Sequence, residues 1–311
     1  MVDMDHRPAG PADNRSEIRD FLARRRAQLT PEQVGLPTGG RRRVPGLRRE
    51  EVAVLAGVST EWYTRLEKGH ISGVSEDVLE AVARTLQLSA DERTYLFDLA
   101  RAAQPGPASR RRRKAVDVPP RVQWLLDSMT LSAAFVSNGR RDIVAGNALT
   151  RALFAPMFNS FTTDERGRPN FARYHFLDRG SHDFFDDWQS AAKTTVAVLR
   201  AEAGRYPNDK AMRELVGELS TVSTEFRTLW AAHDVRVHHG GVKRFQHPDA
   251  GPLELTYQPL DLPISPHEAH SLTIYTAEPG TPDEDRLKLL ASWAATRSRE
   301  TEPADERHPG T

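Results

Sequence analysis

The chain has 311 residues, no cysteine and a formal net charge of zero, and its length is typical of two domains. The missing cysteines exclude disulfide bridges, thiol nucleophiles and thiolate metal sites. Because the start lacks a secretory pattern and no run of about 18 apolar residues exists, we expect a soluble, cytoplasmic protein with no membrane partner.

Charge is distributed unevenly along the chain. Up to Ala115 there are 21 Lys and Arg against 16 Asp and Glu, so a basic front part precedes an acidic remainder. This asymmetry fits a nucleic-acid-binding module fused to a second domain, although chance could produce it too.

The front part begins with a polar segment, residues 1–14, that we expect to be disordered. Ser16 to Leu29 then predicts a helix with Ser16 as its cap. The arginines at 24–26 could contact phosphate or form a solvated face. A connector rich in Pro and Gly follows, residues 30–46, and its three arginines suit contacts to the DNA backbone or minor groove: Arg41, Arg42 and Arg43.

The stretch from 49 to 69 has the pattern of a helix–turn–helix. Val52, Leu55 and Ala56 fall on one face of a first short helix. Gly57 can take the positive φ that ends a helix, and Ser59 can cap the next one. Two helices joined by so tight a turn can place the second in the major groove of DNA, although a plain helical hairpin could imitate the pattern.

The second of these helices buries Tyr63 and Leu66 and leaves a polar edge outward. On that edge Arg65 is suited to a bidentate contact with guanine, and Glu61 could accept from a cytosine amino group. We expect phosphate contacts from Arg48 and Arg49 at the start of the first helix, where free N–H groups already attract anions. The remaining predicted DNA contacts come from Ser59, Thr60, Thr64 and Lys68.

Two further amphipathic helices complete the first domain. One spans Ser75 to Leu86, and the other begins at Ser89, where Ser89 and Glu92 form a capping box. We therefore predict an all-α, five-helix domain over residues 15–104. Residues 105–120, which contain a basic run and several prolines, predict a mobile linker.

The second half changes pattern. A short helix from Arg121 precedes a β-hairpin with a turn at Asn138-Gly139, and two longer helices are predicted over 183–202 and 209–233. Strand patterns follow at 242–248, 252–263 and 270–279, before a helix over 282–295 and a disordered tail over 297–311. The result is an α+β domain with an antiparallel sheet, residues 121–296.

Aromatic side chains are frequent in this half, and most of them should be ordinary core. Where polar groups converge among them, a ligand pocket is the default hypothesis. Arg173, between Phe171 and Tyr174, could anchor a carboxylate. The residues that we expect to contact a ligand are Asn147, Phe171, Arg173, Tyr174, Trp188, Phe226 and Trp230.

At this point the chain resembles a known family. The blocks GGRRRVPGLRREEVAVLAGVSTEWYTRLEKG and SEDVLEAVARTLQLSADERTYLFDLA are similar to the helix–turn–helix of MmyB-like transcription regulators, within the wider XRE/Cro-repressor class. Further blocks, among them NFARYHFLD, KRFQHPDAGPLELTYQPL and YTAEPGT, resemble the ligand-binding domain of that family. The resemblance covers residues 15–295.

The resemblance implies a lambda-repressor-like first domain, a PAS-like second domain and an apolar, fatty-acid-like ligand. It also places Ser59, Thr60, Glu61 and Arg65 at DNA-contact positions, with Arg48 and Arg49 at the backbone. One position departs from the family, because Gly146 stands where a Trp usually precedes the Asn of the second strand. We expect a locally larger pocket or a looser sheet there.

The sequence thus predicts a sequence-specific DNA-binding regulator, expected to be a homodimer, that senses a small apolar ligand. The competing interpretation is a DNA-tethered protein–protein adaptor, and a third is an enzyme with a DNA-binding appendage. No nucleotide-binding, nucleophile-elbow or helical metal-ligand motif is present, so we predict no catalytic residue, no cofactor and no metal site.

Overall fold

The computed structural model describes residues 14–37, 46–103, 118–235, 240–264 and 269–301. It divides into two compact units. Unit 1 combines Met1–Arg112 with Val196–Val237, and unit 2 combines Arg113–Thr195 with His238–Thr311. The predicted tails and the basic segments of the connector and linker lie largely outside the described residues.

Unit 1 contains the five α-helices predicted for the first domain. They are α1 (Asn14–Gln28), α2 (Arg49–Leu55), α3 (Thr60–Glu67), α4 (Glu76–Thr85) and α5 (Ala90–Ala102), with a short 3₁₀ helix, η1 (Glu32–Val34), after α1. Their apolar faces share one core. Later in the chain come the second half of α11 (Trp188–Arg205), then α12 (Lys210–Val222) and α13 (Thr224–Ala231).

Local signals set the turns of unit 1. Gly57 has φ 68° and ends α2, and the Ser59 hydroxyl accepts a hydrogen bond from the Trp62 amide at 3.1 Å to start α3. The capping box of Ser89 and Glu92 is present at the start of α5. These predictions are confirmed. The inward position predicted for Leu55 was wrong, because Leu55 is 39% exposed and the buried face of α2 is formed by Val52, Ala53 and Ala56.

Unit 2 is the α+β part of the chain. Its helices are α6 (Pro120–Ser128), α7 (Ala148–Leu153), α8 (Ala155–Phe158), α9 (Phe171–Leu177), α10 (Gly180–Phe184), the first half of α11, and α14 (Pro282–Thr301). Five strands form one antiparallel sheet in the order β2-β1-β5-β4-β3. They are β1 (Ala133–Asn138), β2 (Ile143–Gly146), β3 (Gly241–His247), β4 (Gly251–Asp261) and β5 (His270–Thr276).

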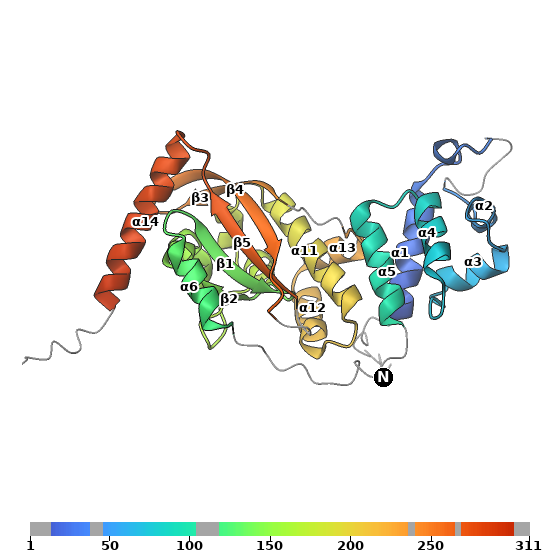
Figure 1. Ribbon diagram of the computed structural model, residues 1–311, viewed down its shortest axis with the longest axis horizontal. Helices are drawn as coiled ribbons and strands as arrows, with labels where there is room; N and C mark the ends of the chain where they lie inside the picture. Colours follow the sequence, from blue (N-terminus) through green and yellow to red (C-terminus); the bar gives the residue numbers. More distant parts are fainter. Residues whose placement is uncertain (1–13, 38–45, 104–117, 236–239, 265–268, 302–311) are drawn as a thin grey trace, which may run out of the picture. The chain divides into compact units, whose positions relative to one another are not determined.

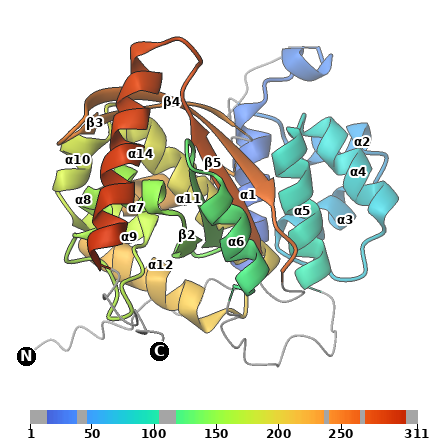
Figure 2. The same cartoon turned by 60° about the vertical axis from the view of Figure 1, so that its left-hand side comes forward.

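Both faces of the sheet are covered within unit 2 (Figures 1 and 2). On one face α6 packs Val122 and Leu126 against Val136. On the other, helices α7 to α10, the start of α11 and α14 bury a large aromatic core. Strand alternation decides which side chains enter that core, because successive residues point to opposite faces.

Some boundaries differ from those expected. The helix predicted over 209–233 is broken at Ser223, whose hydroxyl accepts from the Phe226 amide at 3.1 Å and caps α13. The last helix continues to Thr301, past the predicted start of the tail. At Gly146 the space is filled rather than enlarged, since an added Cβ would lie 3.2 Å from Thr150 Cγ2 and 3.4 Å from Phe135 Cβ.

Candidate functional site

The outer edge of α3 carries the predicted base contacts. Thr60, Glu61 and Arg65 are exposed and Thr64 is partly exposed, while Tyr63 and Leu66 are buried beneath them. Ser59 and Lys68 are exposed at the two ends of the helix. The arrangement presents one polar edge to solvent on a helix that is fixed from below, which is what reading a DNA groove requires.

A buried carboxylate holds α3 in place. Glu67, 1% exposed, accepts hydrogen bonds from Arg26 Nε at 2.8 Å and from Arg26 Nη2 at 2.9 Å. Arg49 Nε also donates to it, at 3.0 Å. This cluster ties α1, α2 and α3 together.

The environment of Glu67 favours its charged form. Burial by itself would raise the pKa of this carboxyl, but the hydrogen bonds and charges of Arg26 and Arg49 outweigh burial and hold the pKa below its usual value. Sequence patterns did not reveal this cluster, because Arg49 and Arg26 lie 18 and 41 positions from Glu67.

The arginines predicted to contact the DNA backbone differ in their surroundings. Arg49 is 46% exposed but pairs with Glu67, so part of its guanidinium is already used inside the protein. Arg48 is 47% exposed, and its Nη1 donates to Glu50 Oε1 at 3.3 Å on the surface. Arg41, Arg42 and Arg43 lie outside the described residues.

Just after α3, the backbone at Gly69 lies very close to the backbone of α1 at Arg15. Gly69 has φ 92°, and an added Cβ would lie 2.5 Å from the Arg15 carbonyl oxygen. Only glycine fits both conditions. The backbone just after α3 is therefore positioned by close contact with α1.

The predicted ligand residues do not form one cluster. Phe171 and Tyr174 belong to the aromatic core of unit 2, with Trp188 packed against that core. Phe226 and Trp230 lie in unit 1, where their rings stack with centroids 5.6 Å apart. The structure does not bring these two together with the other aromatics.

Two of the polar residues in that predicted set have local structural contacts. The Asn147 amide donates to the carbonyls of Met129 at 2.7 Å and Ser132 at 2.8 Å. Its oxygen accepts from Ala134 N and Thr150 N, so every polar atom of this side chain is used within the fold. Arg173 on α9 also has interaction partners within the protein.

Two cations that sequence reasoning missed enter the aromatic interior instead. Arg141, in the turn between β1 and β2, lies with its guanidinium carbon 4.8 Å from the Phe171 ring centroid. Lys243, on β3, places its Nζ 5.4 Å from the Tyr257 centroid and 5.8 Å from that of Phe185. Burial is the largest influence on both and lowers the pKa of each, that of Lys243 to about 7.

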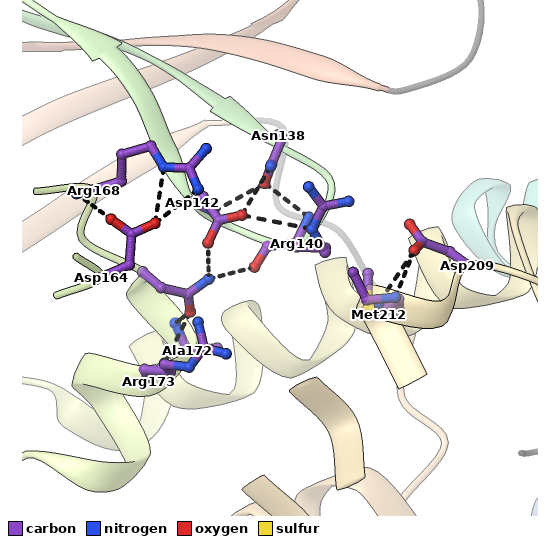
Figure 3. A network of polar contacts seen from close by, with 11 residues as sticks. Asn138, Arg140, Asp142, Asp164, Arg168, Ala172, Arg173, Asp209 and Met212 are labelled. Atoms are coloured by element: carbon purple, nitrogen blue, oxygen red, sulfur yellow. Dashed lines mark hydrogen bonds and ion pairs between the residues drawn. The ribbon is translucent and has the colours of Figure 1, made fainter. Parts of the chain in front are cut away.

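Hydrogen bonds hold the turn between β1 and β2, and Figure 3 shows those around Asn138, Arg140 and Asp142. The Asn138 oxygen accepts from the amides of Arg140 at 3.1 Å and Asp142 at 3.0 Å. Asp142 in turn accepts from Asn138 Nδ2 and from Asn170 Nδ2. This network stabilises the left-handed conformation of Arg141, φ 70°, which is costly for a residue other than glycine.

Comparison with known families supplies the remaining observation. Residues 17–96 match a helix-turn-helix domain family, and residues 118–290, more than half of the chain, match the ligand binding domain of MmyB-like transcription regulators. The chain belongs to the MmyB-like transcription regulator family. No match was found among curated proteins.

The protein is therefore a DNA-binding transcription regulator with a ligand-binding domain. That family is one of regulators, not of enzymes. Among the described residues of this MmyB-like regulator, no group of three or more His, Asp or Glu is placed to hold a metal ion, and none of the helices could cross a membrane.

Part of the matched ligand-binding region of this MmyB-like regulator packs against helix–turn–helix residues within unit 1. Arg200 on α11 is 1% exposed and donates to Glu17 of α1 at 2.5 Å, while its guanidinium lies 4.2 Å from the Trp230 ring centroid. Tyr95 of α5 donates to the same carboxylate at 3.1 Å.

Two further contacts join this later segment to the helices of the helix–turn–helix domain. An added Cβ at Gly204 would lie 2.2 Å from Tyr95 Cε2, so α11 meets α5 at a position where only glycine fits without displacement. Val235, 1% exposed, joins the core of the helix–turn–helix helices. The segment Val196–Val237 therefore belongs to unit 1, whereas the sequence pattern predicts it as part of the second domain.

Proposed function

We propose that this regulator reads operator DNA with the exposed edge of α3 and that its DNA affinity responds to an apolar, fatty-acid-like ligand held in unit 2. The observation that supports the DNA half is the polar edge of α3 above a helix locked by Glu67. We further propose a homodimer acting in the cytoplasm, because two copies can read two half-sites about one DNA turn apart.

Arg65→Ala is expected to relax the preference for one base pair of the operator and to cost about 1–3 kcal/mol of specific binding. A bidentate arginine contributes mainly at the base it contacts, whereas a phosphate contact contributes to all sequences alike. Binding selections on randomised DNA, repeated at two salt concentrations, measure both effects. Lys68→Ala is the comparison variant, and a uniform loss from Arg65→Ala would reassign it to the backbone.

The ligand half of the proposal is supported by the aromatic interior of unit 2. Phe135, Phe154, Phe171 and Tyr275 pack there ring against ring, with centroids 5.5–6.2 Å apart. Polar groups from α9, β3 and the β1–β2 turn approach the same interior. Ligand pockets typically combine an apolar lining with a few such groups.

Coupling between ligand and DNA is proposed to run through α11. This helix is continuous from Trp188 to Arg205; Ala191, near its start, belongs to the core of unit 2, and its second half contacts α1 and α5 within unit 1. A ligand that shifts the start of the helix would change the packing that supports the helix–turn–helix. Coupling of this kind requires different ligand affinities for the two arrangements.

Titration of decanoate during measurement of operator affinity tests this half. We expect a change of about 5-fold or more, as is typical of allosteric coupling. An affinity that stays constant while the ligand is bound would remove the coupling and favour the adaptor interpretation. The exposed apolar side chains of α6, Trp124 and Leu125, would then be the first candidates for a partner surface.

A further inference from the structure

The charged groups buried in unit 1 are paired. Arg200 meets Glu17, Glu67 meets Arg26, and Glu92 meets Arg25. This is the general rule, since an isolated charge inside a protein is strongly unfavourable. Arg141 and Lys243 in unit 2 are partly exposed and differ from these pairs, because no carboxylate among the described residues acts on the pKa of either.

One of the two cations also acts on the other. The charge of Arg141 lowers the pKa of Lys243, in the same direction as burial does. Their charged ends contact aromatic ring faces, which are weaker partners than a carboxylate. A second positive charge that acts on a partly buried ammonium is unfavourable for folding unless something of opposite charge joins them.

We infer that Arg141 and Lys243 together hold the anionic group of the ligand, a carboxylate, with the adjoining aromatic side chains receiving its apolar body. This inference rests on the proposed function and specifies which end of the ligand is recognised, and by which residues. It replaces Arg173, which we had expected to be the carboxylate anchor.

An unsatisfied polar atom supports this position. Arg141 Nε is buried and has no hydrogen-bond partner, and the same is true of His175 Nε2. Arg141 keeps a free donor for a carboxylate oxygen. The other nitrogen of His175, Nδ1, lies 2.8 Å from the Phe171 carbonyl, which can only accept, so Nδ1 carries the proton and Nε2 is an acceptor. A carboxylate cannot bond to that nitrogen, so the support comes from Arg141 alone.

Both cationic side chains are only partly shielded from solvent, although burial dominates their pKa values. The hydrogen-bonded turn fixes the backbone that carries Arg141 before a ligand arrives, so that less ordering is needed on binding.

The pair makes binding dependent on pH. The groups that face Lys243 are Arg141 from the β1–β2 turn, Tyr257 from β4, and His175 from α9, whose pKa burial and the Lys243 charge lower to about 3. Without ligand the pKa of Lys243 is about 7, and a bound anion would raise it. Binding should therefore take up a proton when the pH is above about 7, and affinity should fall as pH rises further.

Calorimetry on the full chain tests the inference with decanoate, decan-1-ol and decyl phosphate. Decanoate is expected to bind at least 10-fold more tightly than decan-1-ol at pH 6.5, and the difference should shrink at pH 9. Lys243→Met should reduce the difference to less than 3-fold while leaving decan-1-ol binding unchanged. The control is Lys193→Met, an exposed lysine on the first half of α11.

A second measurement distinguishes a loss of ligand binding from a failure of the variant to fold. If Lys243 is kept for a ligand, its ammonium is unfavourable in the unliganded fold, so Lys243→Met should raise the thermal midpoint without ligand. Equal binding of decanoate and decan-1-ol by the wild type would overturn the anion site and leave the apolar-ligand proposal standing. Preference for decyl phosphate would assign the pair to a phosphate group, and binding of none of the three would count against the proposed function itself.

Discussion

Arg200→Met is expected to lower the free energy of unfolding of unit 1 by about 3–5 kcal/mol, because it removes one partner of a buried ion pair. The Arg200 side chain is 1% exposed and that of Glu17 is 15% exposed, and the methionine leaves the Glu17 carboxylate with the Tyr95 hydroxyl as a hydrogen-bond donor. Methionine has a similar length, so the loss should reflect charge more than an empty space. Hydrogen exchange of the α1 and α5 amides reports on this unit separately from unit 2.

The double variant Glu17→Gln/Arg200→Met is the internal test. Removing both charges should recover much of the lost stability, since the cost of a broken pair is mainly that of the charge left behind. Lys210→Met, which breaks the exposed pair with Glu214, should change stability by less than about 1 kcal/mol. Similar losses from Arg200→Met and Lys210→Met would mean that the buried pair contributes little.

The same variant bears on the proposed coupling. If α11 transmits the ligand signal, Arg200→Met should weaken the effect of decanoate on operator affinity more than it weakens ligand binding itself. The two affinities are measured separately, with calorimetry for the ligand and fluorescence anisotropy for DNA. An unchanged ligand effect in a folded Arg200→Met protein would exclude this route.

Glu67→Gln is expected to destabilise the helix–turn–helix by about 2–3 kcal/mol, because hydrogen bonds between charged groups contribute more than neutral ones. The substitution keeps the shape of the side chain but leaves Arg26, whose side chain is 18% exposed, without its counter-charge. Operator binding should fall as well, since α3 loses its connection to α1 and α2. Urea titration followed by circular dichroism measures the stability term.

The pH dependence of the wild type gives a separate check. Because the folded pKa of Glu67 lies below its unfolded value near 4.5, its contribution is complete above pH 4.5 and is lost as pH falls through the folded pKa. Glu67→Gln should therefore flatten the decline of stability in acid. Glu50→Gln, on the exposed side of α2, is the control and should leave that decline unchanged. If the wild type, Glu67→Gln and Glu50→Gln lose stability equally in acid, Glu67 does not control the decline.

The parts of the fold that were predictable are those that local chemistry decides. Gly57 and Ser59 mark the turn between α2 and α3 because one accepts a positive φ and the other caps a helix. Alternation of Leu253 and Leu255 with polar residues identified β4 for the same reason, since one face of a strand is buried. Each of these signals spans only a few residues.

The parts that were not predictable depend on contacts between distant residues. Glu17 and Arg200 are 183 positions apart, and nothing near either one in the chain marks it as buried. Arg141 and Lys243 each look like an ordinary surface cation in a turn or on a strand. Their role emerges only when the sheet places β3 and the β1–β2 turn around the same aromatic side chains. Leu55 was misplaced for a related reason, because helical periodicity allows two neighbouring faces and packing chooses between them.

The discontinuous composition of unit 1 has a practical consequence for anyone dissecting or recombining this protein. Val235, Gly204 and Arg200 contribute to the same folded body as α1 and α5, so a fragment ended at the basic linker would lose them. Such a fragment would expose the Tyr95 ring and the Glu17 carboxylate to water. Chimaeric regulators made by exchanging the front domain at that linker would combine α1 and α5 of one protein with the packing partners of another. Residues 196–237 should therefore be exchanged together with the front domain.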